Sequence, residues 1–332
     1  MNERRIGSGG PSGDGPVVRP IVSPSSPVSP LVHPASPSVP SGNSGAPQGT
    51  TTPTPDPRRR LSAAAIDRIR DRLSDRDIAV LRSVDEHQFL TTRQIETLHF
   101  AAIAPNARDR ITRRVLARLR GLRVLDTLER RIGGTRAGSR GFIYHVGIAG
   151  DRLLDRPTRR SARLRYEPTT RFVDHRLAVA DTHIRLITAA RDGVLELVDH
   201  SVEPGSWQRY TGLGSARRIL KPDLFAETTT SETCEEVRAW FIEVDLGSEH
   251  IPTLLTKCRE YEAYRQTGIE QDQHGGFPLV IWSMTATTPE RAARRRRDLA
   301  DAVAADRRLP GALFRIVAPD ELLTLIERGG AS

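Results

Sequence analysis

Apolar residues recur at helical spacing in the middle of the chain. Ser74 and Asp77 resemble a capping box, and the apolar positions that follow predict a helix over about residues 75–86. The segment LTTRQIETL predicts a second, short helix like the first helix of a helix-turn-helix pair. Pro105 is a typical first residue of a third helix.

The third predicted helix has one apolar and one basic face. At 100° per residue Ile111, Val115, Leu119 and Leu122 lie within about 80° of one another, which indicates a packing face. The opposite side carries four arginines: Arg110, Arg113, Arg114 and Arg120.

Two strand-like runs, VLDTLERRI and GFIYHV, follow the third helix. The glycine-rich segment GGTRAGSR joins them and predicts a hairpin with Arg136 and Arg140 near its tip. Three helices and a basic hairpin are the winged helix-turn-helix arrangement. Its last helix enters the major groove, where arginine contacts phosphates or guanine, and its wing reaches the backbone or the minor groove. The alternatives are a solvated basic face or a protein-binding winged helix.

After residue 170 the pattern predicts helices alternating with short apolar strands. The order is one helix, three strands, a helix, a strand, a helix, a strand and a closing helix. This order favours an α+β or α/β domain with a mixed central sheet covered by helices.

The charge and composition divide the chain into segments. Residues 1–57 hold 13 of the 23 prolines without apolar periodicity, which predicts a disordered tail. Residues 58–150 carry 20 basic against 10 acidic side chains, the predicted linker 151–170 is basic, and residues 167–332 carry 21 basic against 26 acidic side chains. The basicity is therefore local, which favours one lobe that binds a polyanion, double-stranded DNA, beside a lobe with another task.

Several classes of protein are disfavoured. The N-terminus lacks the apolar core of a signal peptide, and no segment has the run of apolar residues that spans a bilayer, so we expect a cytoplasmic protein without a membrane partner. Cys234 and Cys258 have no CxxC or Cys/His spacing around them, which argues against a disulfide framework or a zinc site.

The C-terminal segment contains the motifs KPDLF and, twenty residues after Asp223, FIEVDLG, with Lys257 on the following helix. Together with the strand order, these motifs resemble the PD-(D/E)xK nuclease superfamily. From the winged helix to the apolar strand after IEVDLGSEHIPTLLTKCREY, residues 74–320 look like the actinobacterial replication-relaxation family.

The resemblance implies a metal-dependent nuclease site. Asp223 and Glu243 would hold Mg²⁺, or Mn²⁺, through carboxylate oxygens, with the Val244 carbonyl as a further ligand. The residue two positions after Glu243 is Asp245, where the superfamily has lysine, so by resemblance to members with a relocated lysine Lys257 would supply the ammonium. Without the resemblance, such an acidic pair and lone lysine are usually solvated.

The distribution of lysine supports this interpretation. Only two of the 50 basic residues are lysines, and both lie at the motif, Lys221 just before PD and Lys257 on the helix after EVD. Lysine is a compact point charge and is not equivalent to arginine. His175 and His183 are interpreted as structural, and residues 294–297, all arginine, as an exposed helical face.

Two functions from different classes fit these observations. In the first, the chain is a DNA-binding protein of plasmid or mobile-element replication and relaxation, with a C-terminal nickase that works beside replication or conjugation proteins. In the second, it is a non-catalytic regulator whose nuclease-like domain mediates dimerisation or partner binding. Helix-turn-helix proteins often bind DNA as dimers, so a homodimer is a further expectation. A third and weaker hypothesis is that the chain is an adaptor whose proline-rich tail recruits partners.

Overall fold

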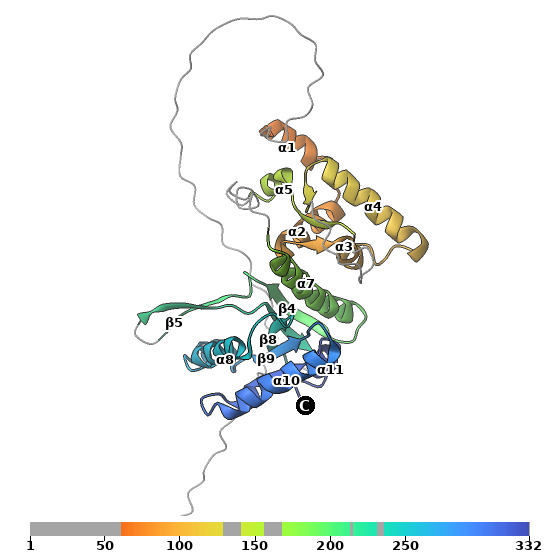
Figure 1. Ribbon diagram of the computed structural model, residues 1–332. Helices are drawn as coiled ribbons and strands as arrows, with labels where there is room; N and C mark the ends of the chain where they lie inside the picture. Colours follow the sequence, from red (N-terminus) through yellow and green to blue (C-terminus); the bar gives the residue numbers. More distant parts are fainter. Residues whose placement is uncertain (1–60, 129–140, 156–167, 213–214, 231–235, 332) are drawn as a thin grey trace, which may run out of the picture.

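The structure is a computed structural model that describes residues 61–128, 141–155, 168–212, 215–230 and 236–331. Within these residues a small sheet and its helices form an N-terminal lobe, and a larger sheet with helices on both faces forms a C-terminal lobe (Figure 1). None of the helices in these ranges combines the length and the apolar character needed to cross a membrane.

The N-terminal lobe begins with helices that include the three predicted ones. They are α1 (Ala63–Arg70), α2 (Asp75–His87), α3 (Thr92–His99), α4 (Pro105–Gly121) and, after the strands, α5 (Ile148–Leu153). Ser74 and Asp77 form the predicted capping box at the start of α2, and Thr91 with Gln94 forms a second one at the start of α3. The sequence analysis did not predict α1 and α5.

Three short strands complete the lobe: β1 (Leu90–Thr91), β2 (Leu125–Thr127) and β3 (Ile143–Val146). They form an antiparallel sheet in the order β1-β3-β2. The predicted pair of strands after the third helix is therefore present, and β1 adds a strand of two residues. Arg136 and Arg140 lie outside the described residues.

Helix α4 packs with a face close to the predicted one. Thr112, Leu116 and Leu119 are buried, while Ile111 and Val115 are half-buried. The centre of the packing face is therefore shifted by about one residue from the predicted stripe, because a tilted helix buries side chains on both sides of the stripe.

The C-terminal lobe begins with the long helix α7 (Thr170–Arg191), and its strands and helices follow in the predicted order with a few additions. The strands are β4 (Glu196–Val202), β5 (Gln208–Thr211), β6 (Arg217–Leu220), β7 (Leu224–Thr229), β8 (Arg238–Asp245), β9 (Leu279–Met284) and β10 (Phe314–Val317). The helices after α7 are α8 (Ile251–Arg265), α9 (Ile269–His274), α10 (Pro289–Ala305), the 3-10 turn Gly311–Leu313 and α11 (Leu322–Glu327).

Five of these strands form a mixed sheet in the order β10-β9-β8-β7-β4. The pairs β4–β7 and β7–β8 are antiparallel, and β8–β9 and β9–β10 are parallel. Side chains of α7 and α11 pack on one face, and those of α8 and α10 pack on the other. A mixed sheet covered on both faces agrees with the sequence prediction.

The predicted strand RILKPDLFAE is divided in the structure. Its first half is β6, which pairs with β5 in a separate hairpin, and its second half is β7 in the central sheet. Pro222 lies between the two halves, and proline has no N–H for a sheet ladder. The break places Asp223 at the end of β7 rather than inside a longer strand.

Helix α7 belongs to the cores of both lobes. Ala180 and Ile184 pack in the N-terminal core beside residues of α2, α3 and α4. Val179 and Leu186 pack on the central sheet. Because opposite faces of one helix enter two cores, the lobes share a rigid element.

The capping carboxylate of α2 generates a prediction for stability. Asp77 is only 1% exposed, accepts from Ser74 and forms an ion pair with Arg118 of α4, so one side chain both starts α2 and fixes it to α4. We expect Asp77→Ala to lower the free energy of unfolding of this lobe by about 1–3 kcal/mol. Asp75→Ala, at an exposed position of the same turn, should cost less than about 1 kcal/mol. Urea denaturation followed by circular dichroism measures both, and equal losses would contradict the role given to Asp77.

Candidate active site

Two carboxylates lie opposite each other where β7 begins and β8 ends. Leu224 pairs with Ile242 in the antiparallel register, which brings Asp223 beside Glu243. Side chains alternate along β8, so Glu243 lies on the same face as Phe241, the face covered by α8 and α10. The carboxylates thus lie near the carboxyl ends of the parallel strands β8 and β9, the edge at which α/β sheets commonly bind ligands.

Asp223 is held from two sides. The Val244 N–H donates a hydrogen bond of 2.8 Å to its Oδ2, and Nε2 of His175, on α7, lies 3.2 Å from its Oδ1. Burial alone would raise the pKa of Asp223, but the Lys257 charge and the His175 hydrogen bond outweigh burial and lower the pKa to about 2. Asp223 is therefore ionised at neutral pH.

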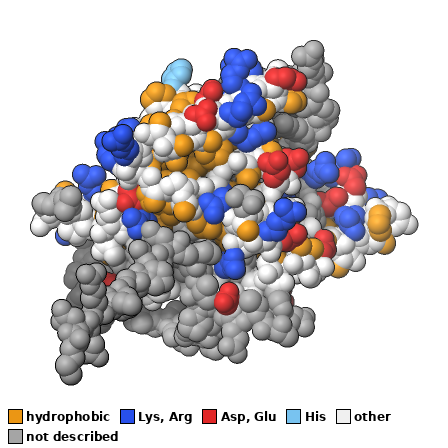
Figure 2. Space-filling view, turned by 90° about the horizontal axis from the view of Figure 1, so that it is seen from below, with side chains coloured by type: hydrophobic (Ala, Val, Ile, Leu, Met, Phe, Trp, Pro, Cys, Tyr) orange, Lys and Arg blue, Asp and Glu red, His pale blue; other side chains and the backbone are white. Residues whose placement is uncertain are grey.

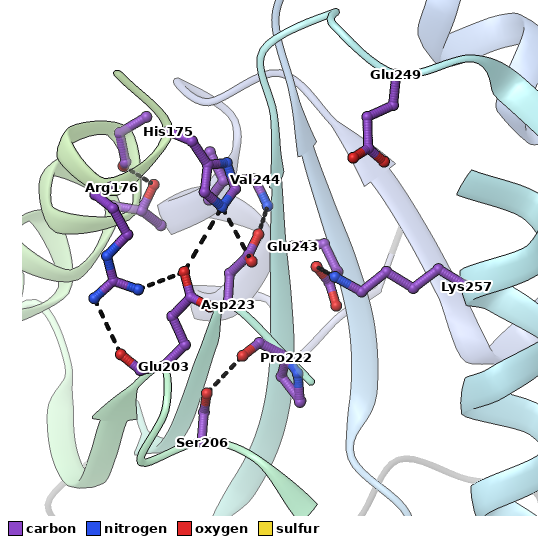
Figure 3. A network of polar contacts seen from close by, with 12 residues as sticks. His175, Arg176, Glu203, Ser206, Pro222, Asp223, Glu243, Val244, Glu249 and Lys257 are labelled. Atoms are coloured by element: carbon purple, nitrogen blue, oxygen red, sulfur yellow. Dashed lines mark hydrogen bonds and ion pairs between the residues drawn. The ribbon is translucent and has the colours of Figure 1, made fainter. Parts of the chain in front are cut away.

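Glu243 is buried and contacts two side chains of α8. Lys257, which reaches toward Glu243 in Figure 3, forms an ion pair with its Oε2. The Tyr261 hydroxyl donates to its Oε1. Residues four apart lie on one side of a helix, so α8 presents both groups to the same carboxylate. Burial raises the pKa of Glu243, whereas the charges of Glu243 and Asp223 outweigh burial at Lys257 and raise the pKa of its ammonium.

Asp245 lies on the same side of β8, two residues further on, and has its own cation. Its Oδ2 accepts two hydrogen bonds from Arg295 of α10, at 2.7 and 3.0 Å. Arg295 therefore balances the charge of Asp245.

A cavity of about 370 Å³ joins these groups. It is lined by all four residues predicted for catalysis, namely Asp223, Glu243, Asp245 and Lys257, and also by His175, Glu249 and Trp282 among others. The predicted site residues therefore converge on one cavity, and α7, the strand ends and α8 form its walls (Figure 3).

Four contributors were not predicted. His175, interpreted from the sequence as structural, contacts Asp223, and the charge of Asp223 raises its pKa against the effect of burial. Glu203 lies 4.0 Å from His175 and forms an ion pair with the buried Arg176. For Tyr261 the sequence held a weak signal: it lies four residues after Lys257, which places both side chains on the same side of a helix. For Arg295 and Glu203 no local signal existed, because their contacts depend on how α10 and the β4–β5 connection pack.

The predicted basic face of α4 is exposed. The arginines Arg110, Arg113, Arg114 and Arg120 all lie at the surface. Arg113 forms an ion pair of 2.9 Å with Asp109, and Arg120 lies over the Phe142 ring. Arg113 and Arg120 line a groove of about 1350 Å³ whose other walls include α3 and α7, whereas Arg110 and Arg114 do not line it.

The C-terminal lobe has a different surface. Seen from below, the described part of the visible face carries basic and acidic side chains interspersed around apolar areas (Figure 2). In the run 294–297, Arg294 and Arg297 are exposed as expected, but Arg295 binds Asp245 and Arg296 donates to the Met284 carbonyl. The prediction of a wholly exposed face is therefore wrong for two of the four arginines.

Comparisons with known proteins give one match. A family model described as replication-relaxation matches residues 81–280, a segment that runs from α2 through both lobes to β9. No curated protein and no solved structure matches the chain significantly.

The Glu243–Lys257 pair generates a prediction with a defined pH dependence. Lys257→Met leaves Glu243 buried without a cation, and its pKa in the folded state rises further above that of the unfolded chain. A carboxyl group whose pKa is raised by folding stabilises the folded chain at low pH, where it is protonated. This contribution to the free energy of unfolding is lost as the pH rises through the pKa of the folded state. In metal-free buffer the variant should thus lose about 3 kcal/mol of stability at about pH 9 and much less at about pH 5.

The matched control is the second lysine of the chain. Lys221 is exposed and lies over the Trp207 ring, so Lys221→Met makes the same chemical change without leaving a buried carboxylate unpaired. Urea denaturation at the two pH values measures both variants. A deficit for Lys257→Met that is independent of pH would contradict the pairing.

Proposed function

The chain belongs to the replication-relaxation family, and we propose that it binds double-stranded DNA through its N-terminal lobe and nicks one strand at the Asp223–Glu243 site. A nick releases the supercoiling of a closed circular molecule. The proposed role is in the replication or relaxation of plasmid or mobile-element DNA, with Mg²⁺ or Mn²⁺ as the cofactor.

The arrangement of the N-terminal lobe supports the DNA-binding part of the proposal. The order α2, β1, α3, α4, β2, β3, with β3 central in a small antiparallel sheet, is the order of a winged helix. In such a domain α4 would be the recognition helix, and it is the helix that exposes four arginines. A helix fits the major groove of DNA, and exposed arginines bind phosphates or base edges there.

One observation carries the nuclease part of the proposal. Two carboxylates from adjacent strands and an ammonium from the next helix line one cavity, although they are separated by up to 34 residues in the sequence. In the PD-(D/E)xK arrangement the same three groups meet at the same end of the sheet. Lys257 reaches Glu243 from α8, which supports a relocated lysine in place of the one that Asp245 replaces.

The donor set fits a hard divalent cation. Carboxylate oxygens are the ligands that Mg²⁺ prefers, and Asp223 and Glu243 would hold the ion at the cavity. When bound there, Mg²⁺ supplies a Lewis acid that neutralises charge on a scissile phosphate and activates water.

The surrounding residues would prepare the two carboxylates. The Val244 N–H and His175 keep Asp223 ionised and fix its orientation, and Tyr261 orients Glu243. The Lys257 ammonium, beside Glu243, would then stabilise negative charge on the phosphate during cleavage. Each of these residues lies on a strand end or a helix, which holds the site more rigidly than a loop would.

A second function, that of a non-catalytic DNA-binding regulator, is favoured by one feature of the same site. Asp223, Glu243 and Asp245 already contact protonatable or cationic groups of the protein itself, namely His175, Lys257 and Arg295. A set of charges that is balanced without a metal also suits a purely structural core. In that case the C-terminal lobe would mediate dimerisation or partner binding.

The DNA-binding part yields a quantitative prediction. The double variant Arg113→Ala/Arg114→Ala removes two exposed cations of α4, so we expect weaker binding to duplex DNA and a shallower salt dependence. The slope of log K against log salt should fall by about 2 if both arginines contact phosphates. Fluorescence anisotropy with labelled duplexes at several salt concentrations measures this slope.

The control for this experiment lies on the other lobe. Arg294→Ala/Arg297→Ala removes the same charge from the exposed face of α10 and should leave the affinity nearly unchanged. Equal losses in both double variants would mean that binding follows net charge and not the surface of α4.

The nuclease part predicts metal-dependent nicking of supercoiled plasmid. Asp223→Asn and Glu243→Gln each keep the side-chain shape and remove the charge that would hold the metal, so nicking should fall by more than about 100-fold. Gel electrophoresis of the open-circular product, in Mg²⁺ and in Mn²⁺, measures the rate. Duplex binding by the two variants should persist because the carboxylates lie in the other lobe.

Glu196→Gln, an exposed carboxylate of β4, is the matched control and should nick like the wild type. Nicking that survives in Asp223→Asn and Glu243→Gln would assign the activity to another site or protein. A wild-type chain that binds DNA but never nicks it with either metal would leave the regulator as the function.

A further inference from the structure

Three histidines form a continuous chain between the two lobes. His87 comes from α2, His183 from α7 and His200 from β4. Nε2 of His87 lies 2.9 Å from Nδ1 of His183, and Nε2 of His183 lies 2.7 Å from Nδ1 of His200. The first two rings are buried, and the third is partly exposed.

The hydrogen bonds determine which nitrogen atoms carry protons. Nδ1 of His87 lies 2.8 Å from the Ser83 carbonyl, which only accepts, so this nitrogen is the donor. The Nε2 of a neutral His87 then accepts from Nδ1–H of His183. This order leaves the Nε2 lone pair of His183 directed toward His200.

Burial of the rings disfavours the charged imidazolium form. Burial lowers the pKa of His87 to about 4 and also lowers the pKa values of His183 and His200. Neutral imidazole is the form that binds metal ions.

A carboxylate completes the group. One oxygen of Glu86 and one ring nitrogen each of His183 and His200 lie within 4.8 Å of one another. Glu86 precedes His87 at the end of α2, and its side chain makes no hydrogen bond or ion pair with any other residue in the described part of the chain. An unpaired carboxylate therefore lies beside two imidazole nitrogens.

We propose that His183, His200 and Glu86 bind a divalent transition metal ion, with Zn²⁺ as the best match, at the junction of the two lobes. Two imidazole nitrogens and one carboxylate oxygen are a set of ligands that zinc accepts, with a water as the fourth ligand. His87 would act as a positioning residue. Metal-binding histidines usually donate their second ring N–H to a fixed acceptor, as His183 does to His87 and His87 to Ser83.

The alternative is a hydrogen-bonded chain without a metal, in which a proton joins His183 and His200. The zinc site and the metal-free chain of histidines differ only by small changes in the positions of the rings and of one proton. Around zinc the two nitrogens would lie about 3.3 Å apart instead of 2.7 Å, and the proton on His200 would move from Nδ1 to Nε2.

His200 can make this adjustment because it is partly exposed on an edge strand. A register shift between Leu197 and Asp199 interrupts the β4–β7 pairing just before it. Such irregularities loosen the ladder locally and redirect side chains.

The position of the site determines its consequence. Its ligands come from α2 of the N-terminal lobe, from the shared helix α7 and from β4 of the central sheet. A bound metal ion would therefore fix the two lobes to each other. The site is separate from the cavity of Asp223 and Glu243 and does not depend on the proposed nuclease activity.

The test is zinc binding by the full-length, tag-free chain after removal of metals by chelation. Isothermal titration with Zn²⁺ should give one site, and Co²⁺ should give the visible absorption bands of a four-coordinate complex. Thermal unfolding should shift upward with Zn²⁺, because an ion that binds only the folded chain stabilises it. His200→Ala and Glu86→Gln, both outside the buried core, should each weaken binding by more than about tenfold.

Two controls keep the result specific. His274→Ala removes a histidine of α9 and should bind Zn²⁺ like the wild type. Asp223→Asn removes the carboxylate of the other group that could attract zinc, His175 with Glu203 and Asp223, so the zinc that this variant still binds belongs to the junction site. The proposal is overturned if Asp223→Asn binds no zinc, or if its zinc binding survives the further changes His200→Ala and Glu86→Gln.

Discussion

The molecule depends on one helix that is buried from two sides. Val179 and Leu186 of α7 pack on the central sheet, while Ala180 and Ile184 pack in the N-terminal core. The buried Arg176 on the same helix donates to the His87 carbonyl of one lobe and to the Glu203 carbonyl of the other. Because α7 has buried residues on opposite faces, neither lobe buries it fully without the other. This constraint places the exposed arginines of α4 and the acidic cavity in a fixed relation.

The cavity shows how buried charge is tolerated in this fold. Glu243 is 1% exposed, and removing a carboxylate from water costs several kcal/mol unless a cation and hydrogen bonds replace the water. Lys257 and Tyr261 provide that replacement from one side of α8, and Arg295 provides it for Asp245. Such an arrangement is expensive for a residue with no task, and an apolar pair of similar volume would be as stable. Three buried carboxylates around one cavity are therefore not explained by stability alone.

The sequence predicted those features that depend on neighbouring residues or on the order of strands and helices along the chain. Ser74, Asp77 and Pro105 mark the helix starts correctly because capping depends on neighbouring residues. The resemblance implied by the motifs and strand order placed Asp223 and Glu243 on neighbouring strands, and the antiparallel pairing of β7 with β8 brings them beside each other. The strand β1 escaped detection because two residues carry no periodicity. His175 and Arg295 escaped because their roles depend on the angles at which α7 and α10 cross the sheet, which no local pattern encodes.

The same helix connects the cavity at Asp223, the chain of three histidines, and helix α3 beside α4. His175, near the start of α7, contacts Asp223 in the cavity, and His183, two turns later, joins the histidine chain to α2 and β4. Asp181, between them, accepts a hydrogen bond from Gln94, which caps α3 beside the basic helix α4. A displacement of α3 would therefore act directly on α7, and a rigid helix transmits such a displacement along its axis. Because packed cores resist continuous deformation, the contacts of α7 hold the two lobes in a defined arrangement.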